Sequence, residues 1–174
     1  MTLHTILTPE WIHEAKLIAA ENPRLEGFVP SEGGLHPRIL LLGEAPGDKE
    51  VKIGRPFMGP SGKELDRWLA SLGLTREDIY ITGVVKSRPF SIGKTGRKSD
   101  RRPNQKEVKR SAAMFDWELS HFQVPRPKSV IYMASCWNAQ FKNITSRRIP
   151  LNSLRKNIKS FLCIIHRIRS GSRI

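Results

Sequence analysis

Residues 43–62 are rich in small residues and read Gly-Glu-Ala-Pro-Gly, then Gly-Arg-Pro-Phe-Met-Gly, then Pro-Ser-Gly. Small residues let a chain turn sharply and present backbone N–H groups to a ligand. The segment is not a phosphate-binding P-loop, because Glu64 follows Gly62-Lys63 where Ser or Thr is required, and Phe57 stands where the first Gly should be. We interpret it as a ligand-binding loop, with an ordinary strand-to-helix turn as the alternative.

A second polar segment, residues 86–103, is basic and 18 residues long. Loops of this length without secondary structure are uncommon and are usually functional or mobile. Lysine and arginine side chains are suited to contacting phosphates. The candidate cations for such contacts are Lys86, Arg88, Lys94, Arg97, Lys98, Arg101 and Arg102.

Each loop follows a segment that is typical of a buried strand. Residues 38–42 contain a continuous apolar run, and residues 79–85 are rich in β-branched side chains. Continuous apolar runs are typical of strands that are buried on both faces in a parallel sheet. Because ligands bind outside the carboxyl ends of such strands, we expect the two loops to meet at one site.

Strands and helices alternate along the rest of the chain. Helices are predicted over residues 9–22, 63–72, 104–122 and 137–144, and further strands over residues 129–134 and 160–165. This order predicts an α/β protein, a three-layer α/β/α sandwich with a mainly parallel four-stranded central sheet. We expect one domain over residues 1–174, with an atypical basic C-terminal segment at residues 142–174.

Charge is distributed unevenly along the chain. Lys and Arg number 30 and Asp and Glu number 16, which gives a formal net charge of +14. Residues 1–85 carry a net charge of −3, and residues 86–174 carry +17. Such asymmetry indicates a nucleic-acid partner, with a solvated basic face as the alternative.

The sequence contains two cysteines, Cys136 and Cys163. They are too few for a disulfide scaffold, a four-cysteine zinc site or a four-cysteine iron–sulfur site, so we expect no metal and no cofactor. No apolar run approaches the roughly 18 residues of a membrane helix, and the first nine residues lack the pattern of a signal peptide. We therefore expect a cytoplasmic monomer with reduced thiols and no membrane partner.

Three motifs resemble the uracil-DNA glycosylase superfamily, in particular its family-four, iron–sulfur branch. They are the GEAPG run, the GRPFMGPSG run and the segment YITGVVKSRP at residues 80–89, and the resemblance covers residues 38–140. The resemblance implies an α/β/α sandwich that hydrolyses the N-glycosidic bond of uracil or another deaminated base flipped out of DNA.

The resemblance also implies roles for individual residues of the first loop. Glu44 would lie beside the attacking water or the base, and Glu50 is a further acidic position of the motif. Backbone amides at Ala45 and Gly47 would be directed at the uracil O2, where negative charge develops. Phe57 would stack on the uracil ring, and its alternative is a core phenylalanine.

The sequence departs from the family pattern at several positions, among them the N-terminal cysteine pair and a later helix cysteine, which have no counterparts here. Gly83 replaces the Asn that reads the uracil edge, Ser87 replaces a cluster cysteine, and Asp100 replaces a second Asn. His166 is the best candidate for the histidine of the family's His-Pro-Ser loop, but no proline follows it. The iron–sulfur cluster should therefore be absent, and recognition of uracil should be weakened.

Two functions remain open. The first is a DNA repair glycosylase, favoured by the GEAPG run, Glu50 and Phe57. The second is a DNA-binding member of the same fold with weak or no base-excision activity, favoured by the changes at Gly83, Asp100 and His166. A small-molecule phosphate enzyme is disfavoured, because no phosphate-binding motif is complete.

Overall fold

The computed structural model describes residues 5–34, 36, 37, 39–121 and the backbone of 129–133. The helices are α1 (Pro9–Glu21), α2 (Asp48–Ile53), α3 (Pro60–Ser71) and α4 (Gln105–Ser120), with a 3₁₀ turn η1 (Arg76–Asp78). The strands are β1 (Leu25–Glu26), β2 (Glu32–Gly33), β3 (Ile39–Gly43), β4 (Ile79–Gly83), β5 (Arg88–Ile92), β6 (Lys98–Asp100) and β7 (Ser129–Met133).

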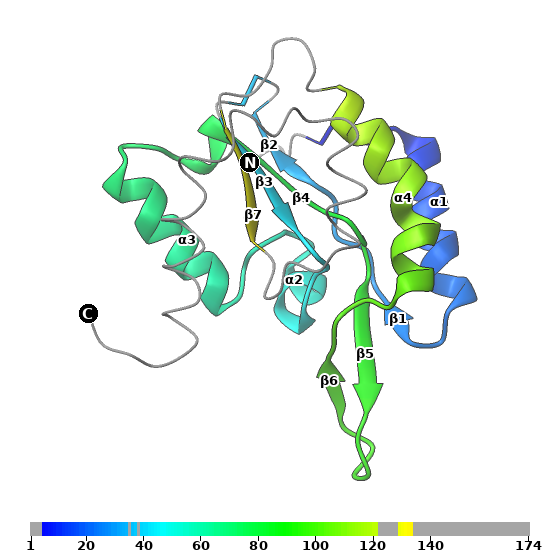
Figure 1. Cartoon of the computed structure of the whole chain (residues 1–174). Helices are drawn as coiled ribbons and strands as arrows, with labels where there is room; N and C mark the ends of the chain where they lie inside the picture. The colour runs from blue at the N-terminus through cyan, green and yellow to red at the C-terminus, as the bar shows by residue number, and fades with distance from the viewer. Residues whose placement is uncertain (1–4, 35, 38, 122–128, 134–174) are drawn as a thin grey trace.

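The larger of the two described sheets has the strand order β2-β4-β3-β7. Strand β3 pairs in parallel with both β4 and β7, and the short β2 pairs antiparallel to β4. In this register Gly43 lies opposite Gly83 on one side and Met133 on the other. Helices α1 and α4 lie on one side of the sheet and α3 lies on the other (Figure 1).

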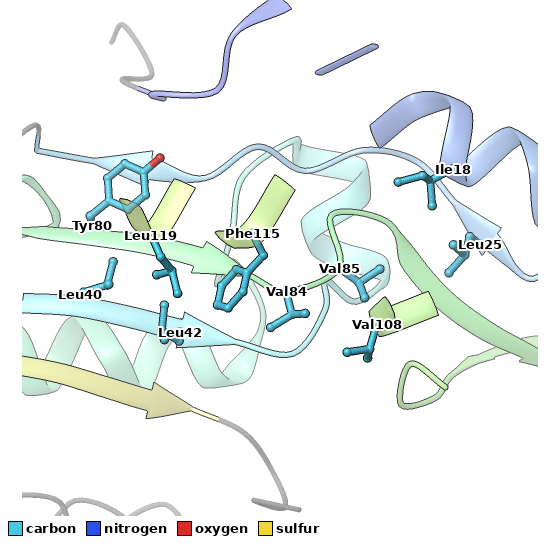
Figure 2. Close-up of a cluster of buried hydrophobic side chains, with 10 residues drawn as sticks. All are labelled: Ile18, Leu25, Leu40, Leu42, Tyr80, Val84, Val85, Val108, Phe115 and Leu119. Atoms are coloured by element: carbon cyan, nitrogen blue, oxygen red, sulfur yellow. The ribbon is translucent and has the colours of Figure 1, made fainter. Parts of the chain in front are cut away.

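Both faces of β3 and β4 are apolar, because successive residues of a strand point to opposite faces. On one face, Leu40, Leu42 and Tyr80 pack with Phe115 and Leu119 of α4 in the cluster that Figure 2 shows. On the other face lies a second cluster, made of Leu41, Ile79, Ile81, Leu65 and Leu69. The two clusters explain why these strands read as continuous apolar runs.

Strands β5 and β6 form a hairpin that extends away from the larger sheet (Figure 1). The expectation of an irregular loop at residues 86–103 was therefore wrong. The hairpin turns through Gly96, which has a left-handed φ of 76°, and the Gly93 N–H donates to the Arg97 carbonyl at 3.0 Å. Its strands are mostly polar, so they lack the hydrophobic pattern by which a strand is predicted from sequence.

The N-terminus of α4 is held by a reciprocal pair of hydrogen bonds. The Glu107 N–H donates to the Asn104 side chain at 3.0 Å, and the Asn104 N–H donates to the Glu107 carboxylate at 2.7 Å. This is a capping box, and it confirms Asn104 as the residue that begins the helix. The Glu107 carboxylate is buried and also accepts two hydrogen bonds from Arg101, at 2.6 and 2.8 Å.

The α/β class is confirmed, and the predicted strands 38–42, 79–85 and 129–134 correspond to β3, β4 and β7. Helix α2 and strand β2 were not predicted. Strand β2 supplies the antiparallel strand of the described sheet, whereas the strand predicted at 160–165 and the helix predicted at 137–144 lie outside the described residues. Within the described part of the chain, no helix is long and apolar enough to span a bilayer.

The Glu107 interaction predicts a pH-dependent stability. Burial acts to raise the pKa of Glu107, but hydrogen bonds from Arg101 and the Asn104 amide outweigh it and hold the pKa below its ordinary 4.5. A carboxylate with a lowered folded-state pKa stabilises the protein above its unfolded pKa and loses that contribution as the pH falls through its folded pKa. We expect Glu107→Gln to lower the free energy of unfolding at pH 7 by about 1–3 kcal/mol.

Urea unfolding at pH 7 and at lower pH measures this effect. The difference between the wild type and Glu107→Gln should shrink as the pH falls below 4.5, the ordinary pKa of the carboxyl. Glu77→Gln is the matched control, because Glu77 is exposed. A loss of stability that is equally large at neutral and strongly acidic pH would contradict the prediction.

Candidate active site

A pocket of about 550 Å³ lies at the carboxyl ends of β3 and β4. Its walls come from residues 43–50, from Phe57 and its neighbours, from the end of β4, and from Asp100 and Arg101. The structure thus brings parts of both loops of interest to the same edge of the sheet. Of the residues singled out from sequence, the lining includes Glu44, Ala45, Gly47, Glu50, Phe57, Gly83, Lys86 and Arg101.

The Glu50 carboxylate links the two halves of the first loop. It accepts hydrogen bonds from the backbone N–H groups of Met58 at 2.9 Å and Gly59 at 2.8 Å through Oε1, and of Gly47 at 3.1 Å through Oε2. The Gly47 N–H was expected to face a ligand, but it donates instead to the Glu50 carboxylate within the same loop. This set of contacts favours a structural function for Glu50, and its catalytic role stays a prediction.

The Phe57 ring lies over the end of β3. A Cβ atom built on Gly43 would lie 3.2 Å from Phe57 Cε2, so the glycine allows the ring to approach the backbone closely. Phe57 is half-buried, and it packs at the edge of the cluster that contains Leu65 and Leu69. One side of the residue therefore contacts the core, and the residue also lines the pocket.

Gly83 lies beside Gly43 in the pocket wall and has no left-handed φ. A Cβ at this position would lie 3.2 Å from the Val85 carbonyl oxygen and 3.9 Å from that of Glu44. The first distance is tight, but the backbone conformation is open to other residues. A positive φ is therefore not a reason for glycine at position 83.

A buried polar cluster lies next to the pocket wall. Lys86 Nζ donates to Glu118 Oε2 at 2.7 Å and to Thr82, whose hydroxyl donates to the same carboxylate oxygen at 2.6 Å. Glu118 Oε1 accepts from the Tyr80 hydroxyl at 2.9 Å and from Ser31. Burial, followed by the charge of Glu118, raises the pKa of Tyr80 far above its usual value.

The positions of Lys86 and Arg88 differ from the expectation that they contact DNA. Lys86 is 3% exposed and paired with Glu118. Arg88 is 5% exposed and donates to three carboxylates, those of Glu26, Asp48 at 2.9 Å and Asp100 at 2.6 Å. Separating a buried ion pair is costly, so neither charge is placed to bind a phosphate.

The other predicted cations are distributed between the body and the hairpin. Arg101 is held by Glu107 at the start of α4, and Lys98 pairs with Glu26 and lies 4.3 Å from the Phe90 ring centroid. Lys94 and Arg97 stand at the exposed hairpin turn, and Arg102 is also exposed. The structure therefore brings Arg101 to the pocket and places Lys94 and Arg97 at the tip of the projection.

Two residues of the pocket were not predicted from the sequence, and three predicted or notable residues lie outside the part of the chain that the structure describes. Asp48 and Thr82 line the pocket, but nothing in their spacing marked them. His166, Cys136 and Cys163 lie outside the described residues. Among the residues that the structure describes, no three His, Cys, Asp or Glu side chains are grouped to hold a metal ion.

The family profile of the Uracil DNA glycosylase superfamily matches residues 30–166, which is most of the chain. The chain therefore belongs to this superfamily, and the resemblance of its motifs is confirmed.

Within the superfamily, the chain is similar to several type-4 uracil-DNA glycosylases. The chain is 37% identical over 114 residues to a type-4 uracil-DNA glycosylase of Archaeoglobus fulgidus, covering 66% of this chain and 51% of the relative. It is 32% identical over 129 residues to the type-4 enzyme of Thermotoga maritima, covering 74% and 60%. The enzyme of Pyrobaculum aerophilum is 36% identical over 103 residues, covering 59% and 47%. The chain thus spans about half the length of the relatives that it matches.

The contacts of Glu50 predict the local stability of the pocket loops. We expect Glu50→Ala to speed amide hydrogen exchange at Gly47, Met58 and Gly59 by about tenfold or more, because hydrogen bonds to a charged group contribute about 1.5–3 kcal/mol. Exchange monitored by NMR reports each amide separately.

The control for this change is Glu64→Ala, since Glu64 pairs only with the exposed Arg67 among the described ion pairs. It should leave the three amides unaffected. Unchanged exchange in Glu50→Ala would show that the carboxylate does not hold these loops together.

Proposed function

We propose that the chain is a DNA glycosylase that hydrolyses the N-glycosidic bond of uracil, or of another deaminated base, flipped out of DNA. The observation that carries the proposal is the Phe57 ring in the wall of a pocket that Glu44 also lines. A volume of about 550 Å³ is in the range of small-molecule sites. The names of the relatives support uracil in DNA as the substrate.

In the proposed mechanism, the flipped base enters the pocket and stacks on Phe57. The bond between C1′ and the base nitrogen breaks, and its electron pair leaves with the base as an anion. A water molecule forms the new bond to C1′, and the Glu44 carboxylate accepts the proton that this water loses. Backbone donors of the 43–47 loop would stabilise the charge that develops on the departing base.

The proposed partner is DNA, which would contact the projecting hairpin with its phosphates and place the flipped base in the pocket. Lys94 and Arg97 at its tip have no carboxylate partner within the described residues, so their charges are available to phosphates. A cytoplasmic monomer with a mainly parallel four-stranded central sheet belongs to the same proposal. The parallel pairing of β3 with β4 and β7 supports this sheet.

An iron–sulfur cluster held by four thiolates does not fit this sequence, which has two cysteines. No step of the proposed mechanism therefore uses one. Glu44, Phe57 and the backbone of the 43–47 loop are the groups that the mechanism requires.

The second candidate function, a DNA-binding protein with weak or no base excision, is favoured by Gly83. A glycine provides no amide to pair with the uracil edge at this point of the wall. A strand-cleavage assay distinguishes the two functions, with oligonucleotides that carry uracil, hypoxanthine or xanthine. Excision of at least one of these bases supports the glycosylase, whereas DNA binding without excision supports the alternative.

Gly83 predicts a slow and poorly selective enzyme. We expect Gly83→Asn to raise uracil excision, because Gly83 lines the pocket and its φ is open to a residue with a side chain. Gly83→Ala is the matched control, since it adds the Cβ without an amide. If both variants fold and Asn gives no gain over Ala, the missing group lies elsewhere in the chain.

The hairpin cations predict the salt dependence of DNA binding. Each neutralised phosphate contributes about 0.7–0.9 to the slope of log affinity against log salt. The double variant Lys94→Gln/Arg97→Gln should therefore lower this slope by about 1.4–1.8, measured by fluorescence anisotropy. Lys106→Gln/Lys109→Gln removes the same charge from the exposed face of α4 and should change it less. Equal slopes for both double variants would contradict a contact at the hairpin tip.

A further inference from the structure

We propose that Arg76 is a positioning residue that holds Phe57 in the conformation that brings its ring to the pocket. Arg76 lies in η1, outside the pocket lining, so any influence it has on the site must pass through another residue. The inference rests on the proposed function in one respect, namely that Phe57 stacks on the base.

Phe57 has a backbone conformation that its side chain disfavours. Its φ is 53°, and among the described residues no other non-glycine residue has a positive φ. The left-handed region is unfavourable for a residue with a Cβ, and it persists only where the surroundings impose it. Something in the structure must therefore hold this peptide.

Arg76 supplies that restraint from one side of the peptide. Its Nη2 donates to the Phe57 carbonyl at 2.6 Å, and its Nη1 donates to the Pro56 carbonyl at 3.0 Å. Glu50 binds the next two residues from the other side, through the N–H groups of Met58 and Gly59. The four backbone groups around Phe57 are thus held between a guanidinium and a carboxylate.

Gly62 makes room for this arrangement. A Cβ built on Gly62 would lie 1.7 Å from the Phe57 carbonyl oxygen, so any other residue would push that carbonyl away from Arg76. The close approach of α3 and the loop therefore requires glycine at this position.

Arg76 is itself fixed by carboxylates. Its Nε donates to Asp66 at 2.8 Å, and its Nη1 lies 3.4 Å from Glu32, which is buried. Glu32 also accepts two hydrogen bonds from Arg55, both at 2.9 Å. Loss of Arg76 would leave Glu32 paired with Arg55, so we expect Arg76 variants to fold.

Two measurements on the full chain test the proposal. The first is the NMR contact between the Phe57 ring protons and the Gly43 α protons, which reports ring position without substrate. The second is the affinity for a single-stranded oligonucleotide with one 2′-fluoro-2′-deoxyuridine, divided by that for the same oligonucleotide with thymidine. This ratio removes the contribution of the DNA backbone.

We expect Arg76→Gln to lose the ring contact and to lower the affinity ratio about tenfold to hundredfold, the value of base–aromatic stacking. Arg76→Lys should do the same, because lysine keeps the charge but lacks the planar fork that binds two carbonyls. Arg67→Gln, which removes an exposed arginine of α3, should change neither measurement. Phe57→Ala should lower the ratio as much, and adding Arg76→Gln to it should have no further effect.

The proposal is overturned if Arg76→Gln keeps the ring contact, if Arg76→Lys restores both measurements, or if the effects of Arg76→Gln and Phe57→Ala on the ratio add. The affinity ratios of the wild type and of Phe57→Ala test the proposed function separately from the role of Arg76. If the wild type does not prefer the uracil nucleotide, or Phe57→Ala leaves the ratio unchanged, base stacking is refuted, and the ring contact still decides whether Arg76 positions Phe57.

Discussion

The parallel pairing of β3 with β4, covered by helices on both faces, is the constraint on which the rest of the structure depends. It sets Gly43 beside Gly83, so the chain segments that leave the two strands start from the same edge. The Val84 and Val85 N–H groups continue the pairing by donating to the carbonyls of Gly43 and Glu44. The pocket therefore rests on the hydrogen-bonded ends of two central strands.

Charge inside the protein is used mainly to hold these segments in place. Glu118 of α4 pairs with Lys86, which follows β4, and Arg88 joins the base of the hairpin to α2 through Asp48 and to β1 through Glu26. In both cases a basic residue that suits DNA binding by its type is buried and paired. The net positive charge of the second half of the chain is therefore larger than the positive charge that a partner can reach. Part of the accessible positive charge lies at the exposed hairpin turn, on Lys94 and Arg97.

Much of the α/β framework was predictable from the sequence because local patterns determine it. The apolar run at residues 39–42, the β-branched run after Asp78 and the Asn104 cap with Glu107 three residues later each act over a few neighbours. The loop with Glu44 and Phe57 was found in the same way, through its glycines and its resemblance to a family. Helix α2 was missed because six residues between glycines carry no clear helical period.

Contacts between distant segments decided the rest. Whether Arg88 faces solvent or three carboxylates depends on Glu26, Asp48 and Asp100, which are far apart in the chain and meet only after folding. The same holds for Arg76, whose hydrogen bonds to the Phe57 peptide cross 19 or more positions. The sequence by itself determined which segments follow the strands β3 and β4, because that is a matter of local order along the chain. Only the tertiary structure decided which charges are buried and how the Phe57 ring is held, because both depend on long-range packing.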